Sequence, residues 1–397
     1  MTPQCAGPPG LRFYPVYTIP DLTVGAIACR PSGPRFAAVL ILLVAAANLA
    51  GQETATRGTL LAPKAFRAAA AKVQPSLVRI EGFGGIAPGV GGGGYQAAGE
   101  GPTTGIILSP DGYIITSTFN FLRKPPIITV VMEGGRRHVA QLLGRDETRK
   151  ICLLKVDGLA DLPVPQLAPR DELKVGQWAV AIGVGFGAQE PALSAGIISA
   201  TSRISTKAIQ TDANTSPANY GGPLVDLEGR VIGVCVPLSP GSREEAAGAE
   251  WYDSGIGFAI PLEGLSEIIG RLKAGETLKH AFLGVASEPF GEPPSGAEIK
   301  EVVPDSPAAK AGLEKGDKIL KVGGAEIMDV THLRSILGRH FAGDRVEVLV
   351  RRGEDETIVT AELAVPPPPK PREAPMPMRA KPGEPQPMPP KPPRPPM

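Results

Sequence analysis

The chain of 397 residues is long enough for two or three domains, each with a hydrophobic core of its own. Its formal net charge of +1, without a basic patch interleaved with aromatic residues, gives no case for a nucleic-acid-binding protein. The composition is otherwise ordinary for a globular protein, except that glycine (49 residues) and proline (44 residues) are both abundant.

The N-terminal region contains an uninterrupted apolar run of 12 residues, 36–47, with Arg30 and Arg35 just before it. This length is typical of a signal-peptide core, because a membrane-spanning helix needs about 20 apolar residues. Cleavage after Ala47 or Ala50 would suit such a signal. The 35 residues before the run are many for a signal, so either the start codon is assigned too far upstream or the run is kept as a short anchor. We therefore assign residues 1–51 to an export signal or short membrane anchor with an N-terminal extension, and expect a periplasmic or cell-envelope protein.

After this region the sequence predicts one helix and then a change to short strands. Pro63–Val73 is rich in alanine and is entered through a proline, which favours a helix. Ser76–Ile80 is a strand-like run, and Gly82–Gly94, with its many glycines, is expected to be a flexible surface loop. Gly105–Thr116 predicts two strands joined by a turn at Asp111-Gly112.

Further short apolar runs follow at the spacing that is typical of an antiparallel β-barrel or sandwich. The predicted strands are Ile127–Met132, Val139–Leu143, Ile151–Val156, Gln177–Ile182, Gly196–Ala200, Lys207–Gln210 and Val231–Pro237.

The cysteines and histidines give no metal-site pattern. Cys152 and Cys235 lie inside apolar strands, and the plain interpretation is that they are small buried core residues, although a disulfide between them is possible in an exported protein. No group of Cys and His residues has the spacing of metal ligands, so we predict no zinc site and no cofactor. Of the four histidines, only His138 precedes residue 280, and an exposed strand histidine is its simplest interpretation.

The segment Thr211–Leu224, TDANTSPANYGGPL, resembles the nucleophile loop T-D-A-x-x-x-P-G-N-S-G-G-P-L of the HtrA (high-temperature-requirement A) family of trypsin-like serine proteases. Tyr220 stands at the position of the serine, and Ala218 stands where a glycine is expected. Acyl transfer needs an unhindered hydroxyl beside a base, and backbone N–H groups aimed at the developing oxyanion. A Cβ at position 218 also disfavours the positive φ that glycine would allow there.

The resemblance covers residues 64–365. GIILSPDGYIIT (105–116) resembles the family's G-x-I-x-x-x-D-G-x-I-x-T hairpin, VGQWAVAIGVGFG (175–187) resembles V-G-x-x-x-x-A-I-G-x-P-F-G with Gly185 for the proline, and GIGFAIP (255–261) matches the segment that closes the protease domain. The resemblance implies a mainly β fold, a trypsin-like double antiparallel β-barrel over residues 52–277.

By the same resemblance, all three catalytic positions are substituted. The family's histidine follows the hairpin as T-N-x-H, and here Phe119 takes its place. The family's aspartate follows G-R-D in G-R-D-x-x-x-D-L-A-V-L-K-V, and here Lys150 takes its place. A Lys150–Tyr220 pair with a lowered phenol pKa is one interpretation of these residues. Packing of Phe119 against Tyr220 is at least as good an interpretation, and the substitutions indicate a pseudoprotease.

A helix is predicted over residues 262–278 from five apolar residues at helical spacing, and a PDZ-like domain (278–365) follows. Phe282-Leu283-Gly284-Val285 resembles the carboxylate-binding loop of a PDZ domain, and Ser306–Val322 resembles S-P-A-x-x-A-G-L-x-x-G-D-x-I-x-x-V. The resemblance implies that a peptide is bound as an added strand, with its last side chain between Leu283, Val285 and the helix Val330–Leu337. Leu333 and Leu337 are equal candidates for the helix side of that pocket, and core packing is the alternative for all of these apolar residues.

The last segment, residues 366–397, holds 16 prolines and six Lys or Arg against two Glu, a net charge of 6 − 2 = +4. We expect a semi-rigid, disordered tail. An inert spacer is the favoured interpretation; an anionic envelope polymer or a proline-binding protein are the alternative partners.

These observations lead to one main hypothesis and two alternatives. The main hypothesis is an exported HtrA-like pseudoprotease that binds peptides or misfolded chains through its PDZ domain, as scaffold, adaptor or holdase. The first alternative is an active serine endopeptidase of the family in envelope protein quality control. The second is a regulatory subunit in a mixed oligomer with active relatives, or a homo-trimer, because the family commonly forms trimers. No nucleic acid is expected as a partner.

Overall fold

The computed structural model describes residues 62–83, 103–122, 124–185, 190–239, 254–287 and 296–367. The apolar run 36–47, most of the glycine-rich segment and almost all of the proline-rich tail lie outside these ranges, so the predictions about them stay predictions. Within the described ranges, no helix is both long and apolar enough to cross a membrane.

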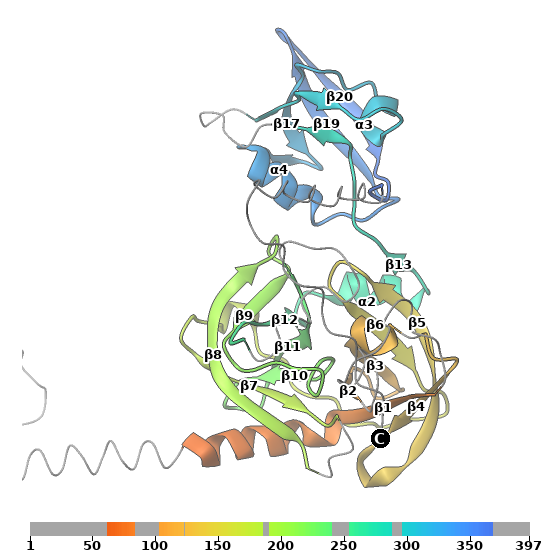
Figure 1. Cartoon of the computed structure of the whole chain (residues 1–397), viewed down its shortest axis with the longest axis vertical. Helices are drawn as coiled ribbons and strands as arrows, with labels where there is room; N and C mark the ends of the chain where they lie inside the picture. The colour runs from red at the N-terminus through yellow and green to blue at the C-terminus, as the bar shows by residue number, and fades with distance from the viewer. Residues whose placement is uncertain are drawn as a thin grey trace, which may run out of the picture. The chain divides into compact units, whose positions relative to one another are not determined.

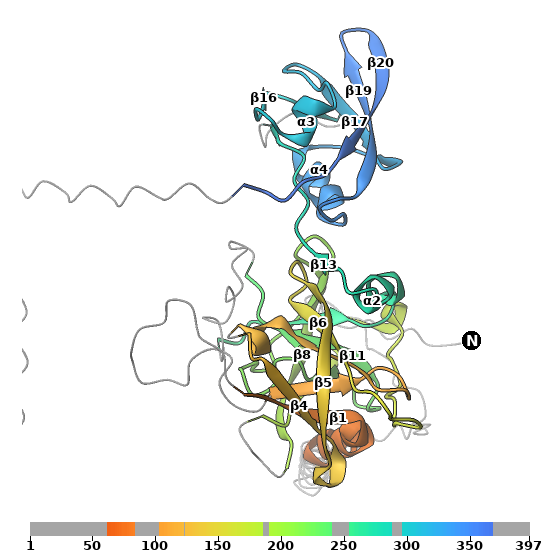
Figure 2. The same cartoon turned by 90° about the vertical axis from the view of Figure 1, so that its right-hand side faces the viewer.

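The first six strands form an antiparallel barrel (Figures 1 and 2). A helix that includes residues 62–73 and a short 3-10 turn, η1 (Gln74–Ser76), lead into it. In space the order is β5-β4-β1-β2-β3-β6, and the barrel closes because β5 pairs with β6 as well as with β4. The strands are β1 (Leu77–Phe83), β2 (Thr103–Ile107), β3 (Tyr113–Ser117), β4 (Ile127–Val131), β5 (Arg137–Asp146) and β6 (Ile151–Lys155).

The next six strands form a second closed barrel, in the order β10-β11-β12-β9-β8-β7. They are β7 (Trp178–Gly183), β8 (Ala192–Arg203), β9 (Ala208–Thr211), β10 (Pro223–Val225), β11 (Val231–Val236) and β12 (Gly257–Pro261). Short 3-10 turns lie in the connections of the two barrels: η2 (Thr118–Phe121), η3 (Glu133–Gly135) and η4 (Arg170–Glu172). The expected double antiparallel barrel is confirmed.

The residues after β13 (Thr277–Leu278) form a small sheet with two short helices. β17 (Lys318–Val322) is central, with β15 (Ala297–Glu298), β18 (Ala325–Glu326) and β19 (Arg345–Arg352) paired to it and β20 (Asp355–Glu362) paired to β19. β14 (Val285–Ala286) pairs separately with β16 (Glu301–Val302). The helices are α3 (Pro307–Lys310) and α4 (Val330–Leu337).

Both helices begin at residues whose side chains satisfy backbone donors. Ser306 accepts a hydrogen bond from the Ala309 N–H at 3.2 Å and precedes Pro307. Asp329 accepts one from the His332 N–H at 2.6 Å. The Asp329 cap marks the start of α4, and the bounds of this helix agree with those that the family resemblance implies.

The predicted helix over 262–278 is too long. α2 covers Ser266–Lys273, although Leu262, Leu265, Ile268 and Leu272 are buried as their spacing implies. The helix ends because Gly275 adopts φ 85°, the left-handed conformation that closes many helices. Thr277–Leu278 then forms β13, which pairs in parallel with the end of β5. The expected loop from Gly82 is also wrong by two residues, since Gly82 and Phe83 complete β1.

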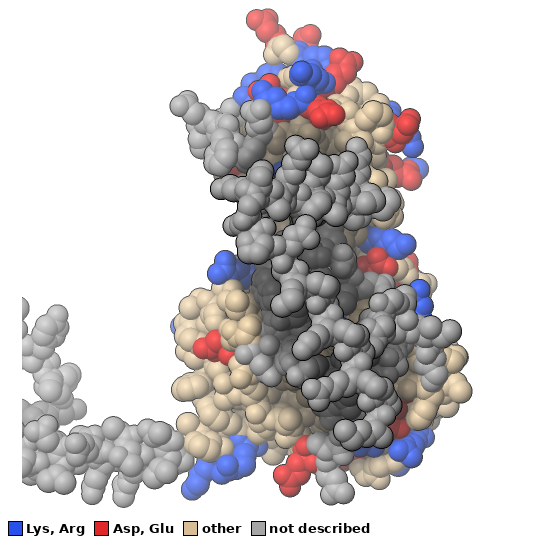
Figure 3. Space-filling view, viewed as in Figure 1, with Lys and Arg blue, Asp and Glu red and all other residues tan. Residues whose placement is uncertain are grey.

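The described surface carries charges of both signs. On the face shown in Figure 3, Lys and Arg side chains are intermingled with Asp and Glu. On the small C-terminal sheet several are paired, for example Arg345 with Glu362 at 3.2 Å and Arg351 with Glu356 at 2.6 Å. This mixture agrees with the net charge of +1.

The two strand cysteines should resist thiol reagents in the folded protein. Cys152 and Cys235 are free and fully buried, and burial raises the pKa of each thiol to about 12. Because the thiolate is the reactive form, we expect no iodoacetamide adduct on either residue at pH 8 in native buffer and adducts on both in guanidinium. Peptide mass mapping separates these sites from Cys5 and Cys29; a native adduct on Cys152 would contradict the buried assignment.

Asp317 should make the C-terminal sheet acid-sensitive. Its carboxylate accepts hydrogen bonds from Arg352 Nε at 2.7 Å and Nη2 at 2.8 Å and from the Glu314 N–H at 2.9 Å. The Arg352 guanidinium lowers the pKa of Asp317 against the opposing effect of burial. A lowered folded-state pKa gives stability that is present above the unfolded value of about 4 and is lost as pH falls below it.

Asp317→Asn should therefore lower the Tm by several degrees at pH 7, and this difference should shrink below pH 4. The control is Asp355→Asn on the exposed end of β20, which should shift the Tm little at either pH. Calorimetry from pH 3 to pH 7 measures both variants, and a Tm difference that stays constant with pH would contradict the role of the Asp317 charge.

Candidate functional site

The three positions that the family resemblance assigns to the triad come from separate segments that the barrels bring together. Phe119 lies in η2, directly after β3 of the first barrel. Lys150 ends the turn between β5 and β6, and its carbonyl accepts hydrogen bonds from the Thr118 N–H at 2.9 Å and from Ser117 Oγ at 3.2 Å. Tyr220 lies in the loop between β9 and β10 of the second barrel. The sequence-predicted cluster therefore exists, with different chemistry.

Phe119 and Tyr220 pack ring against ring. Their centroids are 5.3 Å apart and their planes cross at 78°, an edge-to-face arrangement. Both side chains are almost completely buried, with 2% and 1% of their surface exposed. The Phe119–Tyr220 packing that the sequence analysis weighed against a Lys150–Tyr220 pair is thus observed.

A buried carboxylate on the Lys150 turn is used to build that turn. Asp146 is fully buried and accepts hydrogen bonds from the Thr148 N–H at 2.8 Å and the Arg149 N–H at 3.1 Å. Arg149 Nη1 lies 2.8 Å from its other oxygen. A carboxylate with these partners is a structural group, and Lys150 itself is 5% exposed with a left-handed φ of 58°.

The backbone donors of the nucleophile loop are turned inward. The Tyr220 N–H donates to the Ser216 carbonyl at 3.1 Å, and the Ala218 N–H donates to Ser216 Oγ at 3.3 Å. An oxyanion hole needs these same N–H groups, at the nucleophile position and two residues before it, to point at the substrate. Ala218 is not among the residues with positive φ, as its Cβ leads one to expect.

Buried polar residues that the sequence did not single out hold this loop in place. Asn120 Nδ2 donates to Thr116 Oγ1 at 2.8 Å and to the Tyr220 carbonyl at 3.3 Å. Thr104 Oγ1 donates to the Ala218 carbonyl at 3.1 Å and accepts from the Val184 N–H at 2.8 Å. The only sign of this network in the sequence is that Thr104, Thr116 and Asn120 are polar residues in or beside apolar strands.

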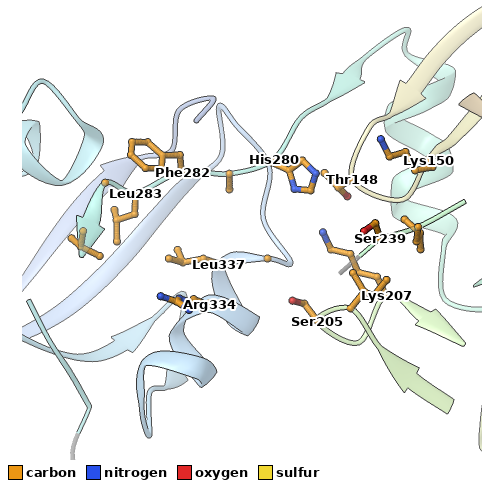
Figure 4. A pocket seen from close by; sticks show the side chains of 16 residues that line it. Thr148, Lys150, Ser205, Lys207, Ser239, His280, Phe282, Leu283, Arg334 and Leu337 are labelled. Carbon is orange, nitrogen blue, oxygen red and sulfur yellow. The ribbon is translucent and has the colours of Figure 1, made fainter. Parts of the chain in front are cut away.

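The expected peptide-binding loop lies at a cavity of about 580 Å³, shown in Figure 4. Phe282, Leu283, Gly284 and Val285 line it, and from α4 so does Leu337, together with Arg334. Gly284 has φ 91°, and a Cβ there would lie 2.2 Å from Cβ of Ser306, so only glycine fits this turn.

The two leucines of α4 have different surroundings. Leu333 is 2% exposed and belongs to the core of the C-terminal sheet, whereas Leu337 is half-buried and faces the cavity. Arg334, which the sequence analysis did not consider, lies three residues before Leu337 and so on the same face of the helix. Leu283 is also 2% exposed, so it contributes to both the core and the cavity wall.

The remaining sequence candidates do not assemble into a second reactive site. His138 lies in β5 and is half-buried, His332 lies in α4, and His340 follows that helix. Within the described ranges no three His, Cys, Asp or Glu residues are grouped so as to hold a metal ion.

Two segments of this chain match known protein families. The model of the trypsin-like peptidase domain matches residues 103–234, and that of the PDZ domain matches residues 272–364. DegP-like periplasmic serine endoproteases are similar in sequence. The one from Marinomonas sp. (strain MWYL1) is 36% identical over 65% of this chain and 56% of the relative. The one from Pseudomonas fulva (strain 12-X) is 34% identical over 70% of this chain and 58% of the relative.

The chain thus spans less than two thirds of the length of these relatives. Among solved structures, the HtrA-type protease AlgW with a decapeptide matches 77% of this chain and 99% of its own, with 27% identity and a TM-score of 0.57. The serine endoprotease from Yersinia pestis matches 75% of this chain and 97% of its own, with 25% identity and a TM-score of 0.56. The chain is therefore HtrA/DegP-like, with a trypsin-like peptidase domain followed by one PDZ domain.

Proposed function

We propose that this chain is a catalytically inactive HtrA-like protein that binds peptides or misfolded chains through its PDZ domain. The observation that carries the proposal is the buried ring pair of Phe119 and Tyr220, 5.3 Å apart, at the positions of the base and the nucleophile. Neither ring can accept a proton as an imidazole does, and a phenyl ring packs against the phenol where the family's imidazole would activate the nucleophile.

The other parts of the site support the same proposal. Lys150 replaces the carboxylate that would orient a base. Asp146 does not take over this role, because its oxygens accept hydrogen bonds from Thr148 and Arg149 of its own turn. The Ala218 and Tyr220 N–H groups already have partners inside the loop. In a serine protease, loss of the serine or the histidine alone costs about a million-fold in turnover, roughly 8 kcal/mol of barrier.

The peptide-binding part of the proposal rests on the PDZ domain. Its loop, Phe282–Val285, and α4 border a cavity, and β14 pairs only with β16 among the described strands. PDZ domains bind an extended peptide as an added strand and hold its carboxylate on loop N–H groups. A domain that binds chain ends but cuts nothing would act as a scaffold, an adaptor or a holdase.

A location outside the cytoplasm is part of the proposal. The relatives are named as periplasmic proteins, and the apolar run 36–47 has the length of a signal-peptide core. Both observations support export to the periplasm or cell envelope.

An active serine endopeptidase is the second candidate, and the names of the relatives favour it. Those names describe proteins that are 34–36% identical to this chain. The two candidates differ in one measurable property, peptide-bond hydrolysis by the purified protein.

We expect no hydrolysis of fluorescein-labelled casein by the wild-type protein, and no labelling by a fluorophosphonate probe. Tyr220→Phe removes the only oxygen at the nucleophile position, and Tyr113→Phe is the matched control, a half-buried tyrosine in the first barrel. All three proteins should give the background rate. Hydrolysis by the wild type that survives in Tyr113→Phe and disappears in Tyr220→Phe would contradict the proposal and support the endopeptidase.

The packed ring pair of Phe119 and Tyr220 should contribute to the free energy of unfolding. Phe119→Ala removes a ring that is 2% exposed, so the free energy of unfolding should fall by about 3–5 kcal/mol. Phe83→Ala is the control, because that ring is 52% exposed and should cost less than about 1 kcal/mol. Urea unfolding compares the two variants, and equal losses would show that the Phe119–Tyr220 contact contributes nothing.

A further inference from the structure

One wall of the peptide-binding cavity carries a positive charge that the C-terminal domain does not use. Arg334 and Leu337 line the cavity from α4, on the opposite side from Phe282 and Leu283 (Figure 4). The described lining also includes Lys150, Lys207 and His280, which already have interaction partners, and among the described residues it contains no aspartate or glutamate. Arg334 is the basic side chain of this lining that is suited to an anionic group of a ligand.

Arg334 differs from the arginines of the neighbouring sheet. Arg345, Arg351 and Arg352 each lie within 3.2 Å of a carboxylate oxygen, from Glu362, Glu356 and Asp317 respectively. Arg334 makes no ion pair and no side-chain hydrogen bond with any described residue, and it is exposed. Its guanidinium is therefore available to a ligand in the groove.

The geometry of strand addition places particular ligand side chains on the α4 side. The carbonyls of Gly284 and Ala286 accept hydrogen bonds from the Val303 and Lys300 N–H groups at 2.9 Å, on the β16 side. The N–H and C=O of Val285 then point to the other edge of β14, where an added strand would pair. Alternate side chains of that strand face α4: the last residue, and the third from the end.

Leu337 and Arg334 are spaced to meet these two side chains. They are three residues apart, about 4.5 Å along the helix axis, while alternate strand residues are about 6.7 Å apart, a difference that an arginine side chain spans. An apolar last residue would contact Leu283, Val285 and Leu337, which leaves the third residue from the end for Arg334.

We propose that Arg334 is a specificity-determining residue that selects peptides with an aspartate or glutamate at the third position from a free carboxyl end. This inference rests on the proposed function, since it names the class of peptide that the PDZ domain binds. The occupant is the carboxyl end of another polypeptide. The acidic side chain at its third position from the end forms a charge-assisted hydrogen bond with the Arg334 guanidinium.

The test measures fluorescence anisotropy of labelled eight-residue peptides with the full-length protein. Each peptide ends in valine, leucine or phenylalanine and carries Asp, Asn or Lys at the third position from the end. We expect the Asp peptides to bind about three- to tenfold more tightly than the Asn peptides, and this ratio to fall at high salt. Arg334→Gln should bring the ratio close to one, and Arg334→Glu should make the Lys peptides the preferred ones.

Arg339→Gln is the matched control, because this exposed arginine follows the same helix, does not line the cavity and changes the net charge equally. It should keep the wild-type ratio. Equal binding of Asp and Asn peptides by the wild type, or a preference that survives Arg334→Gln, would overturn the role of Arg334 and leave peptide binding intact. Binding no tighter than that of peptides with an amidated end would count against both the inference and the proposed peptide-binding function.

Discussion

The contact between the Phe119 ring and the Tyr220 ring is the interaction on which the proposed inactivity depends. One ring comes from the turn after β3 and the other from the loop before β10, so the pair joins the two barrels at the point where a base and a nucleophile would meet. Edge-to-face pairs contribute about 0.5–1.5 kcal/mol beyond the area they bury. A serine placed at position 220 alone would lose this contact and leave its hydroxyl beside the Phe119 ring instead of an imidazole. In the proposed inactive protein, the packing of the two rings thus adds to the effect of the missing imidazole.

The residues that match the family loop have a structural explanation of their own. Thr211 Oγ1 donates to the Ile197 carbonyl at 2.8 Å, and Asp212 Oδ1 accepts from the Ile197 N–H at 2.6 Å. Asn219 Oδ1 accepts from the Ser216 N–H at 2.9 Å. These bonds fix the loop against β8 and shape its turn without any part in proton transfer. A chain that lost catalysis would still need them, so the recognisable frame supports the fold and is neutral on activity.

The sequence and its family resemblance predicted the double barrel, the helix Val330–Leu337 and the clustering of positions 119, 150 and 220, because each depends on local pattern or on a highly specific motif. Sequence prediction failed where tertiary contacts decide. The three-residue strand β10 is too short to show a period. The predicted helix at 262–278 extends past Gly275, although its last apolar residue at helical spacing is Leu272. Leu333 and Leu337 are four residues apart and lie on the same face of α4, so the sequence pattern does not distinguish them. Only the three-dimensional structure shows that Leu333 belongs to the core and that Leu337 lines the cavity. Arg334 was not predicted because the family resemblance implies only apolar residues for the peptide pocket.

The residue at position 150, a lysine where the family has an aspartate, affects both the proposed inactivity and the charge of the cavity wall. An aspartate there would orient a catalytic histidine, and it would also add a negative charge to the wall of the cavity that Arg334 lines. Lysine at this position removes the first role and reverses the sign of the second, a change of two charges in a partly enclosed site where charge interactions are stronger than in bulk water. The absence of an aspartate at this position removes a charge that would repel an acidic ligand. The substitution on which the proposed inactivity rests is therefore also compatible with the proposed binding of acidic chain ends.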